Sequence, residues 1–170
     1  VNLNSSKADL LFEIKSSNPT YVNTININGN TRTQDYVIRR VLDISEGDAF
    51  LSNDTNFIRQ QINSLGFFED VEVKQRNLDG NLVDIDINIK ENQTGTFTAG
   101  ASFGTLDGIT LLTGLNENNI AGTGRKIEFT FNNSENNSEY KINTTDRFFL
   151  NQKIDLTYGL SFKESDFSKS

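Results

Sequence analysis

The sequence predicts an α+β domain with the element order strand, helix, helix, strand, strand, followed by antiparallel transmembrane strands of a β-barrel that is incomplete in this chain. Helical and strand periodicities are mixed up to about residue 92, and only the two-residue period of strands follows. In the later runs one side is apolar and the other polar, which suits a barrel with lipid outside and water inside. A soluble antiparallel sandwich shows the same alternation, so the period alone leaves both architectures open.

Composition narrows the possible functions. The 170 residues include no Met, and the start at Val1 lacks the basic residues and apolar run of a signal peptide, so we expect a piece of a longer protein. Cys and His are absent, which removes thiol nucleophiles, disulfides, the usual zinc ligands and imidazole bases. A net charge of -7 disfavours nucleic acid as a partner. We therefore expect no enzyme active site, no metal site and no cofactor.

The first part shows the signals of an αβ unit. Residues 21–27 alternate in polarity and lead into the turn Asn28-Gly29-Asn30, which predicts a strand. Thr33 is the expected N-cap of a first helix with Asp35 in its first turn, and its apolar face consists of Val37, Ile38, Val41 and Leu42.

Ser52 is the expected cap of a second helix that ends at Gly66 and buries Ile58, Ile62 and Leu65. Strands over residues 67–76 and 82–90 follow, joined by a tight turn at Asp79-Gly80. Asp84 and Asp86 alternate with the apolar residues of the last strand, so we expect them on its solvent side and not in a catalytic pair.

A weak internal repeat suggests how the chain is divided. Residues 7–15 resemble residues 82–90, either because two strands share a composition or because residues 1–16 are the last strand of a preceding unit. The second interpretation gives three parts, which are residues 1–16, a complete unit over 17–92, and about five barrel strands over 93–170. We expect the lipid-facing side chains of these strands to include Phe97, Phe129, Phe131, Leu156, Leu160 and Phe162, and the inward ones to include Thr98, Asp155 and Thr157.

Four motifs occur in a fixed order in the complete unit: Asn28-Gly29-Asn30-Thr31-Arg32-Thr33, Val37-Ile38-Arg39-Arg40, Glu46-Gly47-Asp48-Ala49-Phe50 and Leu65-Gly66-Phe67-Phe68-Glu69-Asp70-Val71. Together they resemble the barrel-proximal POTRA domain of BamA-type proteins. Residues 95–105 are similar to the first barrel strand of that family, and residues 118–124 to the corner after the second strand. Thr145-Asp146-Arg147-Phe148-Phe149 departs from the family, where Pro and Tyr often precede the Phe.

The resemblance implies a factor of the outer membrane, with its POTRA part in the periplasm, that folds and inserts β-barrel proteins. The implied partners are unfolded outer-membrane proteins, assembly-complex lipoproteins and outer-membrane lipid. Arg39 and Glu46 are the implied lipoprotein contact. The resemblance implies strand pairing with substrates at the POTRA module and at the first barrel strand. The implied site in the barrel strand is formed by Gly95, Thr96, Phe97, Thr98, Ala99, Gly100, Ala101, Ser102, Phe103 and Gly104.

The glycines at positions 95, 100 and 104 independently suggest a weak strand, because Gly packs no side chain and costs conformational entropy. They can equally relieve crowding at a curved barrel wall. A TamA-like insertion protein or a two-partner secretion transporter would share this architecture, and a soluble β-rich binding domain is the alternative from another class.

Overall fold

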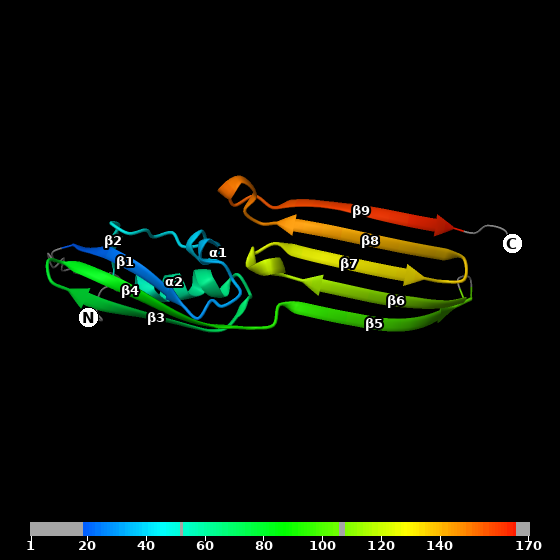
Figure 1. Cartoon of the computed structure of the whole chain (residues 1–170), viewed down its shortest axis with the longest axis horizontal. Coiled ribbons are helices and arrows are strands. Elements are labelled where there is room, and N and C mark those ends of the chain that lie inside the picture. The colour runs from blue at the N-terminus through cyan, green and yellow to red at the C-terminus, as the bar shows by residue number, and fades with distance from the viewer. Residues whose placement is uncertain (1–18, 52, 106–107, 166–170) are drawn as a thin grey trace, which may run out of the picture.

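The computed structural model describes residues 19–51, 53–105 and 108–165, which form two bodies joined by a short link between β4 (Leu82–Glu91) and β5 (Gly95–Gly104) (Figure 1). The first body is a mixed sheet with two helices. The second is a sheet of long strands without helices of its own beyond short 3-10 turns. Among the described residues, no helix is long and apolar enough to cross a membrane.

The first sheet has the strand order β2-β1-β4-β3. Its strands are β1 (Thr20–Asn28), β2 (Ala49–Phe50), β3 (Phe68–Leu78) and β4, with β1 and β4 parallel and the other pairs antiparallel. The turn between β3 and β4 places Gly80 at φ +79, as the Asp79-Gly80 signal predicts. The predicted order of strand, helix, helix, strand, strand is confirmed, and β2 is a further two-residue strand that the sequence did not reveal.

The helices α1 (Asp35–Arg39) and α2 (Asp54–Asn63) cover one face of this sheet and bury the apolar positions that their periodicity predicts. Ile58 and Ile62 of α2 are at most 1% exposed and pack with the inward residues of β1, β3 and β4. Val37 of α1 joins a second cluster with Val41, Leu65 and Phe67. Because α1 stops at Arg39, Val41 and Leu42, which were predicted on its apolar face, lie in the turn that follows the helix.

Two details differ from the sequence prediction, and two further predictions fall on residues that the structure does not describe. Gln34, not Thr33, precedes α1 as its N-cap, because Thr33 is buried and its groups bond elsewhere. The predicted cap Ser52 lies outside the described residues, and so does the predicted strand within residues 1–16. Asp84 is buried and not solvated, since Asn23 and Thr24 donate hydrogen bonds to its carboxylate at 2.7 and 2.8 Å.

The second sheet is an antiparallel meander with the strand order β5-β6-β7-β8-β9. Its remaining strands are β6 (Gly108–Glu117), β7 (Lys126–Asn133), β8 (Asn137–Asp146) and β9 (Leu156–Ser165). The turns β6–β7 and β8–β9 lie at the end of the sheet that faces the first body (Figure 1). Asp155, predicted to face inward from the last strand, precedes β9 and lies in the second of these turns.

Replacing Ile62 by Ala should destabilise the first body by about 2–5 kcal/mol, because the side chain is fully buried between α2 and the sheet. Urea unfolding of residues 17–92, followed by circular dichroism, measures the change. Gln60→Ala is the matched control, since Gln60 lies on the exposed side of the same helix. A loss below about 0.5 kcal/mol for Ile62→Ala would contradict this packing of α2.

Candidate functional site

The predicted pairing strand is β5, and it lies at the edge of the second sheet. All ten of its residues pair with β6, from Gly95 opposite Glu117 to Gly104 opposite Gly108. Within the described part of the chain, no strand pairs with its other edge. A strand edge with unpaired N–H and C=O groups is a template for another strand. The geometry of β5 therefore suits strand addition along its whole length.

The glycines of β5 do not sit in crowded positions among the described residues. A Cβ built on Gly100 or Gly104 would meet nothing within 4 Å, and one on Gly95 would come within 3.0 Å of the Glu117 carboxylate. Among the described residues, only the Gly95 position lies close to another side chain. Few side-chain contacts join β5 to its neighbouring strand at Gly100 and Gly104, because glycine supplies no side chain to a cross-strand pair.

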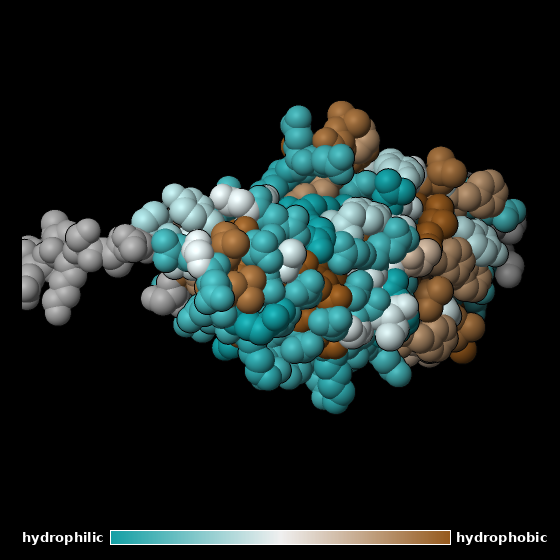
Figure 2. All heavy atoms as spheres, turned by 60° about the vertical axis from the view of Figure 1, so that its left-hand side comes forward, coloured by the Kyte–Doolittle hydropathy of each residue, from teal (hydrophilic) through white to brown (hydrophobic). Residues whose placement is uncertain are grey.

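The second sheet has one apolar and one polar face. A row of apolar side chains crosses all five strands in register: Phe97, Leu115, Phe129, Ile142 and Leu160. Beside it, Phe131 stacks on Tyr140 at 4.7 Å between ring centroids, and Phe162 lies next to Tyr140. The corresponding row on the opposite face is Thr98, Gly114, Thr130, Lys141 and Ser161. Figure 2 shows hydrophobic residues gathered over this body, whereas the surface of the first body is mostly hydrophilic.

Arg39 and Glu46, the predicted lipoprotein contact, lie together beside β1. Arg39 Nη1 is 3.3 Å from Glu46 Oε1, and Arg39 Nε bonds Asp35 Oδ2 at 2.6 Å. The hydrogen bond from Arg39 to Asp35 is the main cause that raises the pKa of Arg39. Both side chains also reach the backbone of Ile25, which the sequence gave no reason to expect.

The structure also shows a junction between the two bodies, centred on Glu91 at the end of β4. Its carboxylate accepts hydrogen bonds from Thr31 Oγ1, Arg32 N and Thr33 N at 2.8, 2.9 and 2.7 Å. Burial by itself raises the pKa of Glu91, but these bonds, led by those from Thr33, outweigh it and lower that pKa to about 2. Glu91 thereby fixes the loop after β1 at the point where the chain leaves the first sheet.

The β6–β7 turn packs against this loop after β1. Asn119 of the turn donates from Nδ2 to Thr33 Oγ1 at 2.9 Å, and its Oδ1 accepts from Gly124 N at 2.7 Å, both in buried surroundings. Gln34 N donates to Gly122 O at 2.9 Å. A Cβ on Gly122 would lie 1.9 Å from Arg32 O, so the two backbones approach at a distance that only glycine permits.

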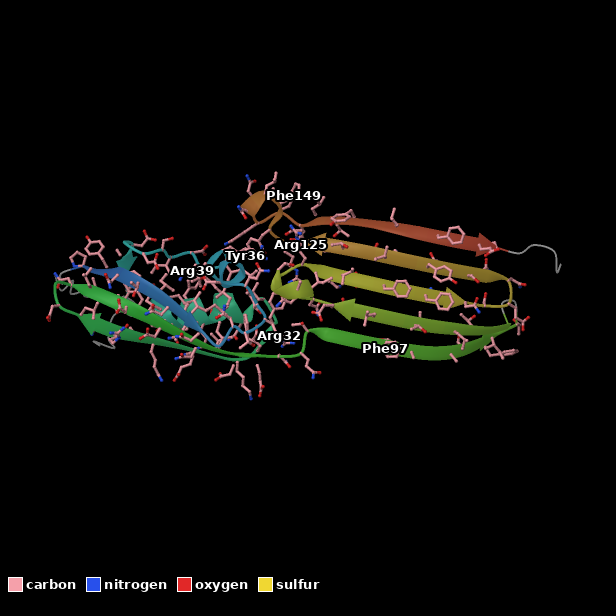
Figure 3. The ribbon with its side chains drawn as sticks, in the orientation of Figure 1. Arg32, Tyr36, Arg39, Phe97, Arg125 and Phe149 are labelled. Carbon is pink, nitrogen blue, oxygen red and sulfur yellow. The ribbon has the colours of Figure 1, made fainter. Side chains whose placement is uncertain are left out.

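The β8–β9 turn makes the second contact with the first body. Phe148 packs against the cluster of Val37 and Val41, and the guanidinium of Arg40 lies 4.5 Å from the Phe148 ring centroid. Burial is the main cause that lowers the pKa of Arg40. Lys153 Nζ and Asp43 Oδ1 form an exposed ion pair at 3.1 Å beside this contact. Figure 3 shows Arg32, Tyr36 and Arg125 gathered where the bodies meet.

Sequence reasoning missed the junction residues Glu91, Asn119, Gly122, Gly124 and Arg40. The sequence feature that could have indicated them is the run from Asn118 to Gly124. It predicts a turn, and it is similar to the corner after the second barrel strand of the family. Nothing in a single sequence says what a turn touches. Among the described residues, no group of three or more acidic side chains could hold a metal ion.

Replacing Gly122 by Ala should separate the bodies without unfolding either. Gly66 has nearly the same φ, +72 against +71, but a Cβ there would meet nothing within 4 Å, so Gly66→Ala is the control for backbone strain alone. We expect the Gln34 amide to exchange hydrogen roughly tenfold faster in Gly122→Ala, because it loses its bond to the Gly122 carbonyl. Equal acceleration in both variants would show that the close approach does not hold the junction.

Several known proteins are similar to this chain in sequence or in fold. Residues 20–92 match the POTRA family model, described as a surface antigen variable number repeat. The protein named outer membrane protein assembly factor BamA of Neorickettsia risticii is 30% identical over 138 residues, covering 81% of this chain and 19% of that protein. The protein of the same name from Neisseria meningitidis is 26% identical over 167 residues, covering 97% of this chain and 21% of that protein. The chain therefore spans only a small part of these relatives.

Two solved structures share the fold. BamA from Haemophilus ducreyi lacking POTRA domains 1-3 superposes with a TM-score of 0.78 at 24% identity, over 89% of this chain and 29% of that one. CdiB from Acinetobacter baumannii gives 0.55 at 15% identity, over 85% and 28%. The repeat match identifies the first body as a POTRA repeat, and the similarity in sequence to the curated relatives and in fold to the solved structures is consistent with a fragment of a BamA-type protein.

Proposed function

We propose that this chain is part of an outer-membrane protein assembly factor that folds and inserts β-barrel proteins by pairing with their strands. In this proposal residues 17–92 are the barrel-proximal POTRA domain in the periplasm, and residues 93–170 contribute the first strands of the barrel. The observation that carries it is the position of β5 at the edge of the described part of a sheet that is apolar on one face only. The names of the curated relatives support the same activity.

The physical argument starts from the cost of bare backbone in hydrocarbon. Each unpaired N–H or C=O group in a membrane costs several kcal/mol, so an unfolded barrel protein cannot enter alone. A strand edge that offers its own donors and acceptors removes that cost for the first strand of the substrate. β5 offers ten consecutive residues for this purpose, the length of one membrane-crossing strand. No nucleotide is required, because folding itself supplies the free energy.

The junction adds a role for the POTRA repeat. Glu91 and the β6–β7 turn hold the first body against the near end of the second sheet, next to the start of β5. A substrate segment bound to the repeat would therefore be delivered close to the pairing edge. The exposed ion pair of Arg39 and Glu46, on the same repeat, is the proposed contact for a lipoprotein partner. The apolar face of the second sheet is the proposed contact with outer-membrane lipid.

The barrel assignment predicts an asymmetry between the two faces of β9. Leu160 is 77% exposed on the apolar face, and Ser161 follows it on the polar face. In the full-length protein in lipid vesicles, Leu160→Arg should cost about 2–4 kcal/mol at mid-membrane, and Ser161→Arg much less. Denaturant unfolding from vesicles measures both. Equal costs would favour a soluble sandwich whose second sheet covers the apolar face.

A disulfide between Cys residues introduced in β5 and in the closing strand of the full-length barrel tests the mechanism. These 170 residues contain no Cys, so the introduced residue is the only thiol in this part of the protein. Locking the seam should stop substrate insertion into vesicles, and reduction should restore it, because pairing needs a free β5 edge. Two Cys residues within the β6–β7 pair give the control. A locked protein that inserts substrates at the normal rate would refute strand pairing at β5.

A further inference from the structure

The two turns that contact the first body share one backbone shape. The β6–β7 turn contains the 3-10 segment η1 (Ile120–Gly122), and the β8–β9 turn contains η2 (Phe149–Asn151). The residue before each segment has similar angles, φ -140 and ψ 57 at Asn119 and φ -132 and ψ 49 at Phe148. In both turns this residue also contacts the first body, Asn119 by a hydrogen bond to Thr33 and Phe148 by packing.

The turns differ at the middle residue of the 3-10 segment, which is left-handed in both. This residue is Ala121 at φ +51 in the first turn and Leu150 at φ +56 in the second. Left-handed backbone is unfavourable for a bulky side chain, whereas Gly or Asn adopts it at lower cost. No packing offsets this strain, because Leu150 is 76% exposed. Stability of the turn therefore does not explain the leucine, and strain of this kind is typical of functional positions.

Leu150 belongs to an exposed apolar patch on the β8–β9 turn. Phe149 is 37% exposed and Ile154 is 50% exposed. Neither Phe149 nor Leu150 packs against the two clusters of buried apolar residues in the described part of the chain. Figure 2 shows a hydrophobic projection at the top of the view, where Figure 1 places this turn. A hydrogen bond from Phe149 N to Ile154 O at 3.1 Å closes the turn, so the patch is presented on a defined backbone.

The position of the patch indicates what covers it. By the two-residue period, Leu156 lies on the same face of β9 as Leu160, which is the apolar face. Ile154 precedes Leu156 by two residues, so apolar side chains continue from this face into the turn. A turn that follows membrane-crossing strands lies at the boundary between lipid and water, where an apolar side chain can still reach hydrocarbon.

The charge beside the patch fits the same occupant. Arg147 is exposed and has no ion-pair partner among the described residues. It lies at the start of the turn, two residues before Phe149. A guanidinium binds phosphate oxygens through paired N–H groups, and basic side chains at a membrane surface are attracted to anionic lipids.

We propose that the β8–β9 turn anchors the protein in the lipid leaflet nearest the first body: Phe149 and Leu150 enter the boundary of the hydrocarbon, and Arg147 binds lipid phosphate groups. This inference rests on the proposed function, which places the second sheet in a membrane. Because Phe148 of the same turn packs in the first body, the anchor also holds that body at a fixed distance from the leaflet. One turn thus connects the lipid with the repeat.

Nitroxide labels on single introduced Cys residues test the proposal in the full-length protein, in vesicles of phosphatidylcholine and phosphatidylglycerol. The measured quantity is the ratio of two collision rates, with oxygen, which concentrates in lipid, and with a nickel chelate, which stays in water. The ratio for Leu150→Cys should be roughly threefold or more above that for Phe57→Cys, because Phe57 is 51% exposed on α2 of the first body. Leu160→Cys on the apolar face provides the lipid reference.

A second measurement removes the apolar tip and keeps the turn folded. Leu150→Asn suits the left-handed backbone, so it changes the side chain without adding strain. It should raise the nickel collision rate of a label at Asn151→Cys roughly twofold or more, because the tip leaves the lipid. Phe57→Asn removes an equally exposed apolar side chain from the first body, and this matched control should leave the rate unchanged.

Three results would overturn the anchor while Leu160→Cys stays in lipid. One is a ratio at Leu150→Cys equal to that at Phe57→Cys, and another is protection of the Leu150→Cys label from both reagents, which would mean that protein covers the turn. The third is an unchanged nickel rate in Leu150→Asn. A label at Leu160→Cys that behaves like the one at Phe57→Cys would refute the barrel itself, and the anchor with it, so failure of the proposed function is recognised separately.

Discussion

Glu91 is the last residue of the last strand of the POTRA repeat. Its carboxylate accepts hydrogen bonds from three donors in the loop that follows the first strand. This contact holds the loop that meets the β6–β7 turn of the second sheet. With the loop fixed, Thr33 turns its hydroxyl to Asn119, and Arg32 brings its carbonyl against Gly122. The carboxylate is 7% exposed and keeps a depressed pKa, so the contact persists through the whole physiological pH range. One acidic side chain thus sets how two sheets are placed.

The fold was largely predictable from the sequence because it depends on local periodicity. Ile58 and Ile62 are spaced one helical turn apart, and both are buried in the structure. The ten residues of β5 were predicted as a strand and form one with the predicted limits. Where prediction failed, the cause was long-range. Thr33 reads as a helix cap, yet its groups bond Glu91 and Asn119, which lie 58 and 86 residues away.

The candidate site was predictable only in part, for the same reason. A two-residue period tells which side chains of β5 share a face, but not that its outer edge lacks a partner in this part of the chain. Arg39 and Glu46 were chosen by resemblance, and no pattern indicated that both would reach the backbone of Ile25. For Asp84, the prediction of solvent exposure was wrong. Its alternation with apolar residues predicted solvent, whereas Asn23 and Thr24 provide hydrogen bonds that make its burial possible.

Two strand edges, those of β1 and β5, lack a full partner among the described residues, and they differ in a way that fits the surroundings proposed for them. In water an edge must be protected from wrong partners, and charged side chains do this at low cost because they remain solvated. The charged side chains of Arg39 and Glu46 protect the β1 edge in this way. In hydrocarbon a charged guard is costly, so an edge that meets lipid must close by strand pairing alone. β5 carries no charged residue in any of its ten positions and has glycines at both ends and in its middle. An edge of this composition forms few side-chain contacts across its seam, which is what the proposed exchange of one strand partner for another requires.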